Sequence, residues 1–111
     1  WGNNDGDKFL LTRNASRFDH VHLHGELAEM ELGNTRIAMT HYPDIAQGLV
    51  GAGRYDLVCY GHDHIAHDEL VGNSRLLNPG ELMGRLGPST LVILEENSGK
   101  AQSIEVENLV R

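Results

Sequence analysis

A short, continuous apolar run constrains the fold of this chain more than any other feature of its sequence. Residues 56–60 read Asp-Leu-Val-Cys-Tyr and lie between polar segments. A run of this length without alternation is typical of a strand that other elements cover on both faces. Apolar residues at helical spacing follow Pro43, which suits the first turn of a helix. The pattern therefore predicts an α/β or α+β fold built on sheets and disfavours a helical bundle.

The rest of the chain is mostly strand-like segments joined by turn residues. The predicted hairpins pair 27–32 with 35–40, 66–71 with 74–77, and 89–95 with 101–110. Gly and Asn occupy the turns, where they tolerate positive φ. We also expect a short helix near residues 9–12. The order is about seven strands with one clear helix.

Length and charge limit the function classes that are open to this chain. Its 111 residues suffice for one domain, and a net charge of −7 makes it a poor general binder of nucleic acid or of anionic membranes. The sequence contains no run of 18 apolar residues, so it predicts no membrane-spanning helix. Cys59 is the only cysteine, so no internal disulfide forms, and we expect a buried, inert thiol in a reducing, cytoplasmic setting.

The tetrapeptide Gly61-His62-Asp63-His64 is the first candidate site, because it directly follows the predicted buried strand. Two histidines at this spacing on a loop can diverge and reach neighbouring metal ions, and imidazole suits divalent metals. Gly61 would let the backbone turn sharply or approach the ions closely. A polar turn with incidental histidines is the alternative, and the tetrapeptide alone does not separate the two.

Three further segments carry candidate residues. His41 lies at the end of another apolar strand, where open α/β sheets place their sites, although a lone histidine there is more often structural. Asn3, in the segment Gly2-Asn3-Asn4-Asp5, has an amide oxygen that suits hard cations, although this segment is also an ordinary turn. The segment Asn78-Pro79-Gly80-Glu81 by itself indicates only a turn.

The order and context of these four segments resemble the calcineurin-like metallophosphoesterases, and most closely the small single-domain phosphodiesterases of that superfamily. The motifs Gly-Asn-x-Asp, His-x-Pro, Gly-His-x-His and Asn-Pro-Gly follow one another along nearly the whole chain. The resemblance implies an α/β fold, the four-layer αββα metallophosphoesterase sandwich. It also implies that residues 1–111 are only the C-terminal two-thirds of that domain, because the family's earlier Asp-x-His and Gly-Asp-x-x-Asp motifs have no counterpart here.

The same resemblance implies two divalent metal ions and a phosphate ester substrate. Asn3, His41 and His62 would bind one ion and His64 the other, and a hydroxide that bridges the ions would attack a phosphodiester. Manganese is the expected metal, and zinc, iron or nickel also suit these donors. Because the family's bridging carboxylate has no match in residues 1–111, we expect this chain alone to lack a complete metal pair and to be inactive.

Two positions depart from the family pattern. Asn4 stands where many members carry a histidine that protonates the leaving group. An amide can hydrogen-bond to a phosphate oxygen but transfers no proton near neutral pH, so leaving groups of low pKa would be favoured. Asp63 stands where threonine or serine is commoner, and it either orients a ligand or faces solvent.

Other histidines and other functions provide the alternatives. His20, His22 and His24 would share one face of a strand, and we favour a solvated or interface face over a metal site. His67 and Arg85 are expected at the surface rather than on substrate. The rival functions are a non-catalytic protein-interaction scaffold on the same fold, like the related retromer subunit, and a plain β-rich binding module. The occupied ligand positions favour the enzyme, and exposed strand edges would favour homo-oligomers.

Overall fold

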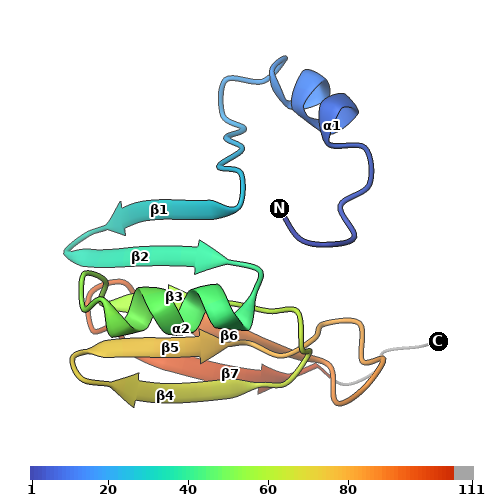
Figure 1. Ribbon diagram of the computed structural model, residues 1–111. Helices are drawn as coiled ribbons and strands as arrows, with labels where there is room; N and C mark the ends of the chain where they lie inside the picture. The colour runs from blue at the N-terminus through green and yellow to red at the C-terminus, as the bar shows by residue number, and fades with distance from the viewer. Residues whose placement is uncertain (107–111) are drawn as a thin grey trace.

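The computed structural model describes residues 1–106, and Figure 1 shows the arrangement of its elements. The elements are α1 (Lys8–Ala15), β1 (Leu27–Leu32), β2 (Thr35–Thr40), α2 (Pro43–Gly51), β3 (Leu57–Cys59), β4 (His67–Val71), β5 (Ser74–Asn78), β6 (Thr90–Leu94) and β7 (Ala101–Glu105). All three predicted hairpins are confirmed. Predicted strand residues 107–110 lie outside the described residues.

Five strands form the main sheet, in the order β1-β2-β3-β5-β4. The strands β2, β3 and β5 run parallel in its middle, and the antiparallel strands β1 and β4 form the edges. The apolar run at 56–60 thus supplies β3, the central strand, as its pattern predicts. Because β2, β3 and β5 are parallel, their carboxyl ends reach the same edge of the sheet (Figure 1).

Two layers pack against the central strands, one on each face of the sheet. On one face, α2 places Ala46 and Val50 in a buried cluster with Val58 of β3. Ala46 and Val50 are four residues apart and therefore share one face of the helix. On the other face, the β6–β7 hairpin brings Val92 and Leu94 against a second apolar cluster. Each fully buried aliphatic side chain contributes roughly 1.5–3 kcal/mol, so this double cover holds the strands in place.

The segment that contains α1, residues 7–24, stands apart from this core (Figure 1). In α1, Asp7 caps the first turn by accepting a hydrogen bond from Leu10 N at 2.9 Å, but none of the helix's residues is buried. The strand that would align His20, His22 and His24 does not form, and these three side chains are exposed in an irregular segment. The preference for a solvated face over a metal site thus fits the structure.

Two further expectations concern Cys59 and membranes. Cys59 is partly buried, where the sequence predicts a buried thiol, and this burial raises the pKa of the thiol to about 11, which keeps it protonated at neutral pH. Among residues 1–106, no helix is both long and apolar enough to cross a membrane.

A polar contact joins the start of β3 to β2. One carboxylate oxygen of Asp56 accepts hydrogen bonds from the backbone N–H of Arg36 at 2.8 Å and from Arg36 Nε at 3.1 Å, and the other accepts from Nη2 at 3.0 Å. The guanidinium and backbone of Arg36 lower the pKa of Asp56 to about 2. The ionised carboxylate therefore stabilises the folded state.

Replacing Asp56 by asparagine is expected to lower the free energy of unfolding at neutral pH, because Arg36 loses its ionic partner. The contribution of Asp56 should be complete above about pH 4 and should disappear as the pH falls toward about 2, since its folded-state pKa lies below the ordinary value of 3.8. Urea denaturation of both proteins across this range measures the effect. A stability difference that stays constant down to the lowest pH would contradict it.

Candidate metal centre

The candidate site lies at the edge where the three parallel strands end. His41 follows β2, His62 and His64 follow β3, and Asn78 is the last residue of β5. The backbone N–H of Gly61 donates to the carbonyl of His41 at 3.1 Å, which joins the first two loops. Open α/β sheets place their sites at this edge, outside the carboxyl ends of the strands.

Three of the predicted ligands converge from distant parts of the sequence. His41 Nε2 lies 2.6 Å from Asn3 Oδ1 and 3.1 Å from His62 Nδ1, and the latter two atoms are 3.3 Å apart. Donors that each lie 2.0–2.1 Å from one metal ion, at right angles to one another, are about 3 Å apart. The spacing of Asn3, His41 and His62 therefore fits three donors to a single ion. We call these three residues the donor trio.

The chemistry of the donor trio also fits a divalent metal. Burial, together with the nearby His62, lowers the pKa of His41 and so favours the neutral imidazole that metals bind. Within the described part of the chain, no three histidine, cysteine or acidic side chains gather as a metal-binding group. The third donor beside His41 and His62 is instead the amide of Asn3.

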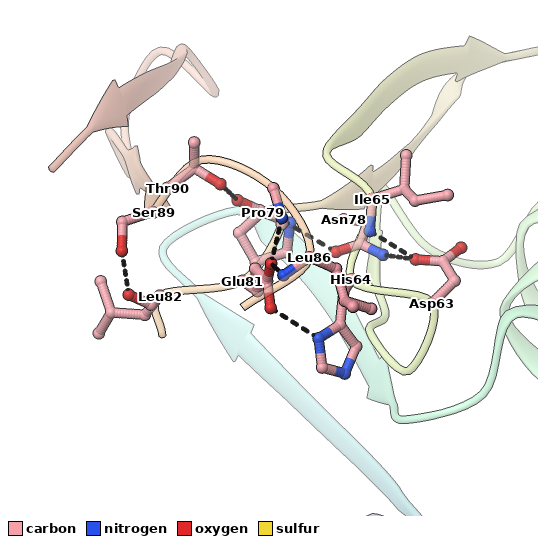
Figure 2. Close-up of polar contacts among 12 residues, drawn as sticks. Asp63, His64, Ile65, Asn78, Pro79, Glu81, Leu82, Leu86, Ser89 and Thr90 are labelled. Carbon is pink, nitrogen blue, oxygen red and sulfur yellow. Dashed lines mark hydrogen bonds and ion pairs between the residues drawn. The ribbon is translucent and has the colours of Figure 1, made fainter. Parts of the chain in front are cut away.

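His64 lies outside the donor trio and contacts a buried carboxylate. Its Nδ1 is 2.8 Å from Glu81 Oε2, and the Glu81 side chain is only 4% exposed (Figure 2). Glu81 Oε1 accepts hydrogen bonds from the backbone N–H groups of Leu86 and, at 2.6 Å, Gly87. His64 and Glu81 line the same open pocket as His41 and His62.

The contacts of Glu81 decide its charge. Burial raises the pKa of its carboxyl, but the hydrogen bonds from His64 and from the backbone of Leu86, Gly87 and Arg85 outweigh burial and lower the pKa to about 2. Glu81 is therefore ionised at neutral pH and can only accept hydrogen bonds. It follows that Nδ1 of His64 is the donor in this pair.

The loop after β3 takes an unusual backbone conformation. His62 has φ 74° and His64 has φ 64°, in the left-handed region that residues other than glycine seldom adopt. Of the two roles predicted for Gly61, the sharp turn is wrong, because the two histidines take the positive φ angles and Gly61 does not, and the close approach to the ions stays a prediction. Such conformations persist only where neighbouring contacts enforce them.

Asp63 and Asn78 supply those contacts. Asp63 N–H donates to Gly61 O at 2.9 Å, and Asp63 Oδ1 accepts from Ile65 N at 2.9 Å. Asn78 is 1% exposed; its Nδ2 donates to Asp63 Oδ1 at 2.7 Å, and its Oδ1 accepts from Gly80 N at 2.9 Å (Figure 2). Asp63 is exposed to solvent and at the same time accepts hydrogen bonds that hold the loop carrying His62 and His64, so both of its interpretations apply.

The remaining candidates lie at the surface. Asn4 is exposed beside Asn3, and Arg85 is exposed in the loop after β5. His67 is exposed, and its Nε2 lies 3.0 Å from Glu69 Oε2. Glu81 and the role of Asn78 were not predicted, because the segment 78–81 by itself indicates only a turn. Their importance depends on burial, which the segment itself does not reveal.

Replacing Asn78 by alanine is expected to destabilise the protein by about 2–4 kcal/mol, because the change leaves a cavity and removes two hydrogen bonds. Asn73, in the exposed turn before β5, is the matched control, and its replacement by alanine should cost less than about 0.5 kcal/mol. Urea denaturation measures both. Equal effects of the two substitutions would show that Asn78 does not hold the loop.

Comparison with known proteins places this geometry in a family. The model of the calcineurin-like phosphoesterase superfamily domain matches residues 1–99. Phosphodiesterase MJ0936 of Methanocaldococcus jannaschii is 28% identical over 110 residues, which are 96% of this chain and 66% of that protein. This chain therefore spans slightly less than two thirds of its curated relative.

Solved structures agree with this match. The structure of an archaeal phosphodiesterase superposes with a TM-score of 0.84 at 28% identity, over 96% of this chain and 66% of that chain. Vps29 from Entamoeba histolytica, in complex with Zn²⁺, has a TM-score of 0.51 at 18% identity over 77% of this chain and 63% of its own, a likeness of fold alone. With its mixed α/β architecture and a family match over residues 1–99, the chain belongs to the calcineurin-like phosphoesterase superfamily.

Proposed function

We propose that the protein is a metal-dependent phosphodiesterase and that this chain carries part of a binuclear metal centre. The convergence of Asn3 Oδ1, His41 Nε2 and His62 Nδ1 carries the proposal. Membership of the superfamily and similarity to an archaeal phosphodiesterase support the class of reaction. Because this chain spans 66% of that relative, the proposal concerns the activity of the whole protein.

The residues of this chain would hold the two ions separately. The donor trio would bind one ion, and His64 would contribute to the second through Nε2. Manganese is the metal that we propose, and zinc, iron or nickel suit the same donors. When bound, the ions supply positive charge for a phosphate and lower the pKa of an attacking water. A chain with a net charge of −7 needs such local positive charge to hold an anionic substrate.

Asn4 would act on the substrate from beside the donor trio. Its amide is exposed next to Asn3, and it can donate a hydrogen bond to a phosphate oxygen. It holds no proton that it can transfer to a leaving group near neutral pH. The enzyme would therefore favour substrates whose leaving groups depart without protonation.

A half-buried single cysteine fits a cytoplasmic enzyme of this kind.

Calorimetric titration with Mn²⁺ tests the donor trio in residues 1–111. We expect one ion per chain, and we expect His41→Ala or His62→Ala to weaken binding at least about 100-fold, since each change removes a direct ligand. His67→Ala is the matched control and should bind like the unaltered chain, because His67 is exposed outside the donor trio. Unchanged binding by His62→Ala, or two ions per chain, would contradict the proposal.

Hydrolysis of a chromogenic phosphodiester by the whole protein with Mn²⁺ tests the reaction. We expect His62→Ala to abolish turnover. Asn4→His should raise the rate about 100-fold or more for diesters with poor leaving groups and change it little for p-nitrophenyl esters, because it introduces a general acid. Mn²⁺ binding at the donor trio without hydrolysis of any diester would favour the scaffold instead.

A further inference from the structure

Glu81 contacts His64 through a polar pair beside the candidate site. We propose that Glu81 is a positioning residue that fixes which nitrogen of His64 carries the hydrogen and aims the other nitrogen into the pocket. The inference rests on the proposed function, in which His64 is a metal ligand. Glu81 belongs to the segment 78–81, whose sequence by itself indicates only a turn.

The carboxylate of Glu81 is held firmly enough to do this. Oε1 accepts the backbone N–H groups of Leu86 and Gly87, and Oε2 faces His64 Nδ1 at 2.8 Å. The backbone of Glu81 is also fixed, since its carbonyl accepts from Thr90 N at 3.0 Å. A rotation of the side chain would break the hydrogen bonds from both of these N–H groups, so they hold the carboxylate in its present orientation.

This arrangement sets the tautomer of His64. A neutral imidazole has one N–H donor and one acceptor nitrogen, and a carboxylate can only accept. The hydrogen of His64 therefore sits on Nδ1, toward Glu81, and Nε2 keeps its lone pair. Figure 2 shows the second ring nitrogen directed away from Glu81, and the ring lines the pocket that also holds His41 and His62.

The two histidines of this loop need opposite tautomers, which is why a dedicated partner is required. His62 presents Nδ1 to the donor trio, so its hydrogen must be on Nε2. His64 must present Nε2, so its hydrogen must be on Nδ1. Both residues share the left-handed backbone conformation, so the backbone does not distinguish them. Of the two histidines, Glu81 contacts only His64, and this contact distinguishes the tautomer of His64 from that of His62.

Glu81→Gln tests the inference, because it keeps the shape of the side chain. The Leu86 and Gly87 N–H groups would retain the amide oxygen as their acceptor, and the amide NH₂ would face His64 Nδ1. The ring would then have to accept at Nδ1 and carry its hydrogen on Nε2. ¹⁵N NMR of the imidazoles without metal, at about pH 9 where imidazoles are neutral, reads the tautomer directly.

We expect the Nδ1–H form of His64 in the unaltered protein and the Nε2–H form in Glu81→Gln. Glu69→Gln, which alters the exposed partner of His67, is the matched control and should leave His64 unchanged. An Nε2–H form of His64 in the unaltered protein overturns the inference whether or not Glu81→Gln folds, and so does an unchanged tautomer in a folded Glu81→Gln.

The same samples separate this inference from the proposed function. In Glu81→Gln, Mn²⁺ binding to the donor trio should stay within about twofold of the unaltered protein, because Glu81 does not contact those residues. A simultaneous loss of trio binding would show that Glu81 supports the whole loop and would overturn a role specific to His64. If the unaltered protein binds no Mn²⁺ yet shows the Nδ1–H form, the proposed function fails and the tautomer assignment stands.

Discussion

The hydrogen bonding of three parallel strands determines where every side chain of the site lies. Because β2, β3 and β5 pair in register, their carboxyl ends coincide, and the loops that follow them emerge at one edge. The packing of apolar side chains from α2 on one face and from the β6–β7 hairpin on the other stabilises this alignment of the strands. A loop of Asn3 and its neighbours then needs only to reach that edge to complete the donor trio.

Much of the fold could be predicted because its signals are local. The unbroken apolar run marks β3, Gly-Asn pairs mark two of the hairpin turns, and Pro43 marks the start of α2. The strand order and the placement of the β6–β7 hairpin could not be predicted in this way. They depend on contacts between residues far apart in the sequence, which no local pattern records.

The candidate site shows the same contrast between features with a local sequence signal and features that depend on distant contacts. His41 and His62 could be chosen because their motifs follow one another in the order typical of the calcineurin-like family, whereas each histidine by itself left the choice open. Glu81 could not, since a glutamate in a turn is ordinary until burial and the N–H groups of Leu86 and Gly87 give it a role. The left-handed angles of His62 and His64 also contradict the local rule that glycine takes such positions, because long-range hydrogen bonds from Asn78 override it.

The way in which Glu81 is held has a consequence for how this surface can change in evolution. The donors that secure it are main-chain groups, so any residue except proline can supply the N–H at position 86. Leu82 and Met83, in the loop between Glu81 and Leu86, are more than 60% exposed. A deletion within 82–85 would move those groups out of reach, whereas substitutions of the exposed side chains at 82 and 83 would not. Gly84, with φ +63°, is the exception, because other residues seldom adopt this conformation. The constraint on this loop is therefore one of length more than of side-chain identity, and positions 82 and 83 can change without moving the N–H groups that hold Glu81.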